Sequence, residues 1–422
     1  MFNHPAFKRL PKKLTISFPL WIIYATKGEY SPYYDIDKLM VENVERGFNC
    51  IRIDSGAGLI HDLEGNLRKS FYLSSYFDGE LDKVPRQQNM LGDGGECNLL
   101  SRLIETFESA KRHGVYVILS QWYFLHTYWF HAKDDPLCDE MFSIPVKERF
   151  PAFAKFWHYI LLELEKRGLD SQLAFVELFN EVSCCPYLCG ERGWGDAVCM
   201  NEEEASFFKK QHEEALAFLQ SEHPQILFAY DTTKSSPQDK KEHQPQNAQV
   251  YNFHSYYLMS IYYAVADEHP EWFSDKYTIE QVKSTRDGRR PITETWYKWV
   301  TQYNNLKKEC VEDFEKALAE KFAKEKETFA DKARRELKFA LSAAEGKIPI
   351  VFGEGVTYIC SKDLQWEEKS EEYWDFVKQR IGEYKAAGLW GTVIRTCCAP
   401  EDPCWYLCRD KLLEINNFFL ND

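Results

Sequence analysis

The sequence predicts an α/β fold of the (β/α)8 barrel type, in which eight parallel strands alternate with helices. Short apolar runs and longer amphipathic stretches alternate eight times along the 422 residues. The apolar runs are continuous, which indicates strands buried on both faces, as in a parallel sheet. No glycine-rich phosphate-binding turn follows the first run, so an open doubly wound sheet is disfavoured.

The expected strands are the apolar runs themselves. They are Leu14–Trp21, Cys50–Ile53, Val115–Ser120, Leu173–Phe179, Ile226–Tyr230, Val250–Phe253, Pro349–Phe352 and Thr392–Thr396. Between them, apolar residues recur at helical spacing. The expected helices are Ile36–Arg46, Leu99–His113, Phe150–Arg167, Glu202–Leu219, Glu371–Ala387 and Lys411–Phe419. Because one barrel can hold from about 200 to more than 400 residues, we expect residues 1–422 to form a single domain.

The connection between the sixth and seventh expected strands is unusually long. We expect residues 258–346 to form a mainly helical insertion within the barrel. In its second half, Val311–Ala344, apolar residues recur at spacings near three, four and seven. Such a stripe is typical of a solvated helical hairpin packed on the barrel wall. The alternatives are a lid or a contact between copies in a homo-oligomer.

Composition and charge exclude several classes of partner. Asp and Glu total 66 against 52 Lys and Arg, a net charge of −14 with no long basic run, which argues against nucleic acid. No stretch of about 18 uncharged apolar residues is present, so no membrane span is expected. Aromatic residues make up 15% of the chain. Their flat faces can stack on sugar rings, and the acidic balance favours sugars as partners.

The chain has 13 cysteines and begins without an apolar segment behind a basic start, so we expect no signal peptide. These features predict a cytoplasmic protein with free thiols; disulfides are the alternative for an exported one. Two groups of cysteines follow the fourth and eighth strands. They are Cys184, Cys185, Cys189 and Cys199, and Cys397, Cys398, Cys404 and Cys408. Neither shows the paired spacing of a zinc knuckle, so we expect buried thiols and no cofactor.

Two glutamates are the candidate catalytic residues. In a barrel, residues at the carboxyl ends of the strands face one shared mouth. Glu181 ends the fourth strand and Glu354 the seventh. Acetal cleavage needs one carboxylic acid to protonate the departing oxygen and one carboxylate to attack or stabilise the anomeric carbon. Arg52 and Tyr256 can keep that carboxylate ionised, and Glu177 is expected to form a buried ion pair with Arg52.

Four segments resemble motifs of the clan A glycoside hydrolases, with the cellulase-like family 5 as the nearest branch. They are Ile51-Arg52-Ile53, Glu177-Leu178-Phe179-Asn180-Glu181, His254-Ser255-Tyr256 and Phe352-Gly353-Glu354. They follow the family's order and span most of the chain. The resemblance implies that Glu181 is the general acid/base and Glu354 the nucleophile of a retaining, metal-independent double displacement. It also implies a separation of about 5–5.5 Å between their carboxyl groups.

The resemblance further implies residues that hold the substrate and the nucleophile. Asn180 would donate to the sugar 2-hydroxyl, His254 would line the subsite where the bond breaks, and Tyr256 and Arg52 would hold Glu354.

Two strand ends depart from the family's pattern. The third strand ends in Ser120-Gln121-Trp122, where the family has a histidine. The eighth ends in Arg395-Thr396-Cys397, where the family often has a tryptophan that forms the floor under the sugar. Trp122 or Trp405 could supply that floor. Tryptophans in other expected loops are also candidates for the cleft; these are Trp129, Trp194, Trp272 and Trp296.

The leading functional hypothesis is therefore a retaining β-glycoside hydrolase that acts on an oligosaccharide or glycoside. The alternative is a cellulase-like barrel that binds sugar without hydrolysing it, which the two departures motivate. A third hypothesis is a thiol-rich metal or redox protein.

Overall fold

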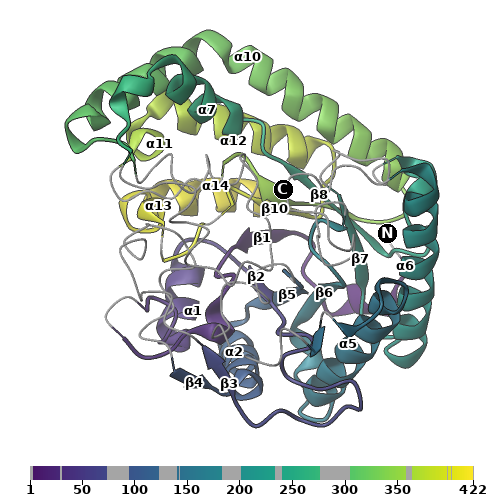
Figure 1. Cartoon of the computed structure of the whole chain (residues 1–422). Coiled ribbons are helices and arrows are strands. Elements are labelled where there is room, and N and C mark those ends of the chain that lie inside the picture. Colours follow the sequence, from purple (N-terminus) through teal and green to yellow (C-terminus); the bar gives the residue numbers. More distant parts are fainter. Residues whose placement is uncertain are drawn as a thin grey trace.

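The computed structural model describes residues 3–28, 31–73, 95–122, 140–141, 143–182, 201–232, 240–275, 305–357, 364–396, 398–400 and 402–421. Eight strands form a closed barrel in the order β1-β10-β9-β8-β7-β6-β5-β2, and every neighbouring pair is parallel. Figure 1 shows these strands at the centre with helices around them. The predicted (β/α)8 barrel is thus confirmed.

The barrel strands coincide with the apolar runs. They are β1 (Leu14–Ser17), β2 (Cys50–Asp54), β5 (Tyr116–Ser120), β6 (Leu173–Glu177), β7 (Phe228–Thr232), β8 (Val250–Ser255), β9 (Ile350–Gly355) and β10 (Gly391–Val393). All their residues are buried except the half-buried Tyr116. Burial on both faces explains why the runs are continuously apolar.

Each predicted amphipathic stretch is helical. The helices of the described part are α1 (Ile36–Glu45), α2 (Leu99–His113), α5 (Arg149–Glu165), α6 (Glu202–Glu222), α7 (Met259–Glu268), α10 (Val311–Ala344), α11 (Trp366–Lys369), α12 (Glu371–Ala386), α13 (Pro403–Leu407) and α14 (Arg409–Leu420). Of these, α7 falls in the expected helical insertion, and the short α11 and α13 were not predicted. Local sequence sets their ends: the Asn98 side chain caps α2 and Gly114, at φ 68°, terminates it. None of the helices in the described part is both long and apolar enough to cross a membrane.

Several short elements lie outside the regular alternation. The strands β3 (Phe71–Leu73) and β4 (Gly95–Cys97) form a separate antiparallel pair. Single 3-10 turns are η1 (Pro5–Lys8), η2 (Ile22–Tyr24), η5 (Val146–Glu148), η6 (Asp170–Gln172), η10 (Lys241–His243), η11 (Pro270–Trp272) and η12 (Lys308–Cys310). The β3–β4 pair was not predicted, because strands of three residues are too short to show a period.

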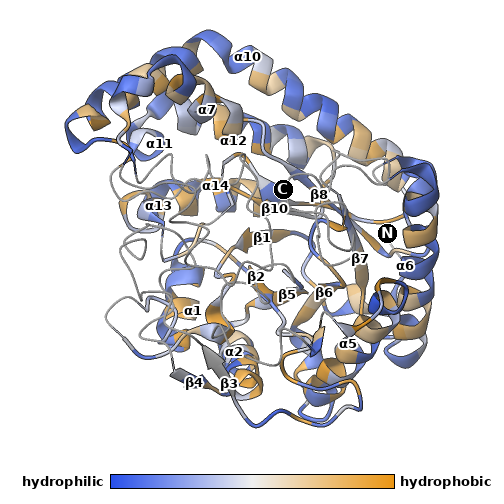
Figure 2. Cartoon of the chain, viewed as in Figure 1, coloured by the Kyte–Doolittle hydropathy of each residue, from blue (hydrophilic) through white to orange (hydrophobic). Residues whose placement is uncertain are grey.

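The hairpin expected for Val311–Ala344 is wrong, because α10 is one continuous helix of 34 residues. The segment contains no Gly or Pro, and the helix ends only where Glu345 and Gly346 adopt φ of 52° and 68°. Six of the seven stripe residues are buried within the monomer, whereas the seventh, Leu341, is exposed; the six are Phe314, Leu318, Phe322, Phe329, Ala333 and Leu337. The helix packs on α7, α12, β8 and β9, and Figure 2 shows mainly hydrophilic residues along it, with hydrophobic ones recurring between them. These six side chains are therefore not exposed to a second copy.

Candidate active site

Side chains from four strand ends meet at the mouth of the barrel. They are Arg52 of β2, Asn180 and Glu181 directly after β6, His254 and Tyr256 at the end of β8, and Glu354 of β9. Hydrogen bonds and ion pairs connect all six. The structure therefore brings together six of the eight residues that the sequence predicted for the site.

Glu354 is 3% exposed and is held by two donors. Arg52 Nη1 donates to its Oε1, and the Tyr256 hydroxyl donates to its Oε2. Burial by itself raises the pKa of Glu354, but the charges of His254 and Arg52 and the bond from Tyr256 outweigh it. The pKa of Glu354 therefore lies below its ordinary value, which keeps the carboxylate ionised.

The Gly353 position in front of this carboxylate tolerates no side chain. A Cβ there would collide with the side-chain amide of Asn252 on the neighbouring strand β8. Asn252 in turn donates to Glu177 within the barrel. The glycine of the Phe352-Gly353-Glu354 motif is thus required by close packing of β8 against β9.

Glu181 lies at a strained backbone position, with φ of 49° in the left-handed region. Its N–H donates to Asp231 Oδ2 at 2.6 Å, and its Oε1 lies 2.8 Å from His254 Nδ1. Burial raises the pKa of Glu181, and the nearby Glu354 charge adds to this, while the His254 contact opposes both. The net pKa of Glu181 is raised, so its acid form is favoured.

His254 shares a proton with Glu181. Burial lowers the pKa of His254, but the charge of Glu354 and the hydrogen bond to Glu181 outweigh burial and raise the pKa to about 9. The Glu181–His254 pair therefore retains a proton through the neutral range, next to an ionised Glu354. One carboxylate oxygen each from Glu181 and Glu354 and a ring nitrogen of His254 all lie within 4.8 Å of one another.

These three residues are also the one group among the described residues that is close enough to hold a metal ion. Their donor atoms already have partners, however. Glu354 accepts from Arg52 and Tyr256, and His254 Nδ1 faces Glu181. Because the Arg52 guanidinium already supplies a buried positive charge beside Glu354, we assign no metal to this group.

Arg52 links the site to the barrel interior. Its Nε and Nη2 lie 3.0 and 2.6 Å from Glu177 Oε2, which confirms the predicted buried ion pair. Its Nη2 also donates to Asn180 Oδ1 at 2.8 Å. The guanidinium lies 4.4 Å from the centre of the Trp122 ring, and this ring is 4% exposed. Trp122 therefore lies in the site region, where it covers Arg52.

The expectation that Trp405 contacts a sugar is wrong. Its side chain is fully buried, its ring stacks on Phe48 at 5.9 Å, and its Nε1 donates to Glu42 at 2.8 Å. Phe48 precedes β2, so this contact lies near the end of the barrel opposite the mouth.

The two departures from the family's pattern have structural roles here. Gln121 Oε1 accepts from Ser55 at 2.7 Å, and its carbonyl accepts the Asn180 N–H at 2.9 Å. Arg395 is buried among three carboxylates, those of Glu367, Glu368 and Asp402, at 2.9 to 3.2 Å. Thr396 Oγ1 accepts from Gly355 N at 2.7 Å. Gln121 thus braces the Asn180-Glu181 segment, and Thr396 braces the end of β9.

The remaining candidates lie elsewhere or outside the described residues. Trp272 stacks on His269 at 3.9 Å and packs on Phe314 of α10. Residues outside the described part are Trp129, Trp194, Trp296, Cys184, Cys185, Cys189, Cys199 and Cys397. The described cysteines all have free thiols, and the expected burial of Cys398, Cys404 and Cys408 is confirmed.

Sequence reasoning missed Asp231, whose carboxylate accepts the Glu181 N–H. The predicted fifth strand ended at Tyr230, two residues too early, whereas β7 extends to Thr232. Asp231 thus lies at a strand end that faces the mouth. A polar residue at the carboxyl end of a predicted barrel strand was the sequence signal that could have identified it.

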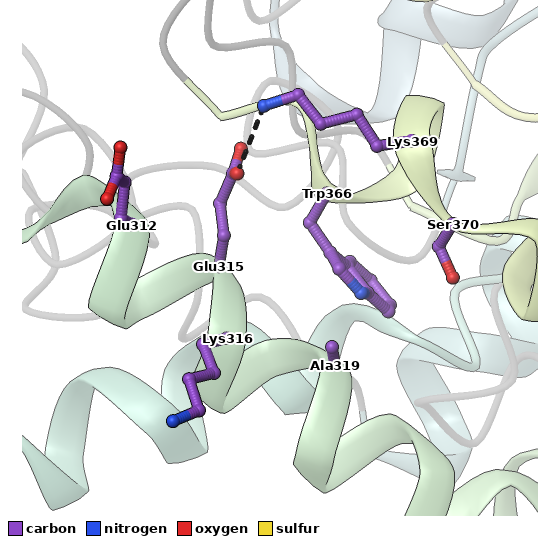
Figure 3. A pocket seen from close by; sticks show the side chains of 7 residues that line it. All are labelled: Glu312, Glu315, Lys316, Ala319, Trp366, Lys369 and Ser370. Carbon is purple, nitrogen blue, oxygen red and sulfur yellow. Dashed lines mark hydrogen bonds and ion pairs between the residues drawn. The ribbon is translucent and has the colours of Figure 1, made fainter.

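A surface hollow of about 390 Å³ lies apart from this network, between the start of α10 and α11. Figure 3 shows its lining, in which Lys369 pairs with Glu315 beside Trp366. None of its lining residues belongs to the network at the barrel mouth.

A (β/α)8 barrel with a glutamate after its fourth strand and another on its seventh has the architecture of a clan A glycoside hydrolase. The model of the cellulase-like family, described as sugar-binding cellulase-like, matches residues 21–416. The chain therefore belongs to this cellulase-like family.

Solved structures share the fold over nearly the whole chain. A candidate glycoside hydrolase from Parabacteroides distasonis ATCC 8503 is 18% identical, with a TM-score of 0.67 and 97% of this chain and 94% of that chain covered. A broad-specificity family 5 (subfamily 4) endoglucanase from an uncultured bacterium is 10% identical, with a TM-score of 0.52 and coverage of 100% and 97%. A family 5 glycoside hydrolase from Prevotella bryantii B14 is 13% identical, with a TM-score of 0.50 and coverage of 100% and 99%. A search of curated protein sequences returned no match.

Proposed function

We propose that the protein hydrolyses a β-glycosidic bond of an oligosaccharide or glycoside with retention of anomeric configuration. The observation that carries the proposal is a pair of glutamates, the half-buried Glu181 and the buried Glu354, with the pKa raised for Glu181 and lowered for Glu354, whose oxygens approach within 4.8 Å. Retaining glycosidases place the two carboxyl groups about 5–5.5 Å apart, whereas inverting ones leave about 6.5–9.5 Å for a water molecule. The short separation favours retention.

The reaction has two displacements. In the first, Glu354 attacks the anomeric carbon, the bond to the leaving oxygen breaks, and Glu181 gives that oxygen a proton. In the second, Glu181 takes a proton from water, the water oxygen attacks the anomeric carbon, and the bond to Glu354 breaks. His254 supports both steps because it shares the proton of Glu181.

Asn180 is proposed to bind the sugar 2-hydroxyl. Its side-chain oxygen accepts from Arg52 at 2.8 Å, so its amide N–H groups are the ones that face a ligand. Hydrogen bonds to the 2-hydroxyl that strengthen in the transition state contribute several kcal/mol in glycosidases. Asn180 is thus positioned by the same arginine that holds the nucleophile.

The test replaces each glutamate by glutamine. We expect E354Q to abolish hydrolysis of aryl β-glycosides, and E181Q to lower it about 10²–10⁴-fold for poor leaving groups, the usual contribution of general acid catalysis. A 2-deoxy-2-fluoroglycosyl fluoride should add one sugar mass to Glu354 of the unmodified protein. Unchanged turnover in both variants, or an initial product of inverted configuration by NMR, would contradict the mechanism.

A second candidate function is sugar binding without hydrolysis. The observation that favours it is that Gln121 and Thr396, in the two strand ends that depart from the family's pattern, have structural hydrogen bonds. Titration calorimetry with cello- and manno-oligosaccharides should then show saturable binding, with no product after long incubation. Product formation at an enzyme-like rate excludes this candidate.

We also propose a cytoplasmic location, supported by the free thiols of all six described cysteines. Alkylation of the unreduced, denatured protein followed by mass measurement should then modify all 13 cysteines.

A further inference from the structure

Asp231 lies at the end of β7, behind the proposed acid/base, and is 2% exposed. A single oxygen, Oδ2, accepts the Glu181 N–H at 2.6 Å and lies 3.8 Å from His254 Nε2 and 4.0 Å from Arg52 Nη2. We propose that Asp231 is a positioning residue that holds Glu181 in its catalytic orientation. This inference rests on the proposed function and deepens it.

The first argument is the backbone of Glu181. A residue with a Cβ disfavours the left-handed region, so the surroundings must hold Glu181 at φ 49°. The Glu181 N–H donates to Asp231, and this bond crosses from the loop after β6 to the neighbouring strand β7. Without this acceptor, the peptide can rotate toward an ordinary conformation, and rotation would move the Glu181 carboxyl away from His254.

The second argument is the arrangement around His254. Its Nδ1 faces Glu181, while its Nε2 lies 3.8 Å from Asp231 and 3.9 Å from Glu354. The Asp231 carboxylate therefore accepts from the backbone N–H of Glu181. It also approaches Nε2 of His254, the ring nitrogen on the side away from Glu181. No other described carboxylate has contacts of both kinds with Glu181 and His254.

The charged groups facing Asp231 come from three strands. They are Arg52 of β2, Glu177 of β6 and His254 of β8, besides the Glu181 backbone. Burial raises the pKa of Asp231 well above its ordinary value, and Glu177 adds to this, although His254 and Arg52 oppose it. A neutral side chain with a suitably placed oxygen should therefore replace Asp231 well.

The experiment compares three variants on two aryl β-glycosides. D231N keeps an acceptor oxygen, whereas D231L has a similar size without one, and D231A serves if D231L does not fold. Hydrolysis of a phenyl glycoside needs protonation of the leaving oxygen, whereas a 2,4-dinitrophenyl glycoside leaves without it. We expect D231L or D231A to lower kcat/KM about 10–100-fold on the phenyl glycoside and less than threefold on the 2,4-dinitrophenyl glycoside. General acid catalysis contributes about 10²–10⁴-fold, and a misplaced Glu181 should lose part of that contribution. D231N should stay within about threefold on both.

The matched control is D54N. Asp54 is also a buried strand-end carboxylate, but it belongs to β2 and accepts from the N–H groups of Gly56 and Trp122 at 2.8 and 2.9 Å and from the Tyr24 hydroxyl at 2.5 Å. Any loss in this variant should be equal for both glycosides. Equal losses on both glycosides in D231L, or losses in D231N as large as in D231L, would overturn the proposal.

A readout without turnover separates this inference from the proposed function. The carboxyl carbon of Glu181 can be followed by ¹³C NMR, with its resonance assigned through E181Q. We expect its titration midpoint to move by about one pH unit in D231L or D231A and to stay in place in D231N. If the unmodified protein hydrolyses nothing, the proposed function fails, while this contrast still supports or overturns the positioning role.

Discussion

At the scale of single residues, Tyr256 and Arg52 both lower the pKa of Glu354, each through a different oxygen of its carboxylate. Arg52 contributes a buried positive charge and Tyr256 a neutral donor to the other oxygen. Burial and the nearby glutamates raise the pKa of Tyr256 well above its usual range, so its hydroxyl keeps its proton at neutral pH and can donate it in a hydrogen bond. The tyrosine is therefore a tuning group whose removal leaves the arginine contact in place.

The variant Y256F tests the contribution of Tyr256. In the proposed mechanism, activity requires Glu354 ionised and Glu181 protonated, so the acidic limb of the kcat/KM profile should report the pKa of Glu354. The Tyr256 bond lowers the pKa of Glu354, and its loss must raise that pKa and move the acidic limb to higher pH. A hydrogen bond to a charged group is worth about 1.5–3 kcal/mol, so we expect kcat/KM to fall roughly 10–150-fold. An unmoved acidic limb would show that Tyr256 does not tune the nucleophile.

At the scale of elements, the hydrophobic pattern of the sequence predicted the barrel strands and the residues that directly follow them. The eight barrel strands were found because burial on both faces makes them continuously apolar, and Glu181 and Glu354 were found because they follow such runs. Trp405 was assigned wrongly, because a pattern does not tell how far the chain travels after a strand. Asp231 was missed because the predicted end of its strand, Tyr230, was two residues short of the end of β7.

The helix α10 shows how an outer element reaches the site. Ser255 donates to Glu336 of α10, and Lys332 Nζ donates to the Tyr256 carbonyl at 3.3 Å. These bonds hold Ser255 and Tyr256, and the side chains of His254 and Tyr256 contact Glu181 and Glu354. The helix therefore holds the end of β8 against the barrel.

Replacing Glu336 by alanine should loosen this segment. Hydrogen bonds to charged groups contribute about 1.5–3 kcal/mol, so E336A should lower the free energy of unfolding by that amount. We also expect kcat to fall with little change in KM, because the catalytic side chains and not the sugar contacts are displaced. Glu327 is exposed on the same helix, and E327A is the matched control in urea unfolding and kinetics. Equal behaviour of the two variants would show that α10 does not position the site.

At the scale of the whole molecule, the first and last segments of the chain both pack into the barrel through strand pairing and hydrogen bonds. The first strand β1 pairs with the last strand β10, and Arg9 near the start donates to the Ser171 and Leu173 carbonyls at 2.9 and 2.8 Å. From the other end, Asn416 of α14 donates to the Arg46 carbonyl at 2.8 Å. Removal of either end would leave strand edges and buried carbonyls without partners.

We propose on these grounds that residues 1–422 form one domain and that the insertion 258–346 unfolds together with the barrel. Because α10 packs directly on β8 and β9, its apolar stripe cannot be exposed without uncovering the barrel wall. Urea unfolding followed by tryptophan fluorescence and by far-ultraviolet circular dichroism should therefore give coincident single transitions. Hydrogen exchange should show the buried amides of α10 opening with the same free energy as those of β9. Lower protection throughout α10 than in β9 would instead show that the insertion is a separate unit, docked on a barrel that is stable without it.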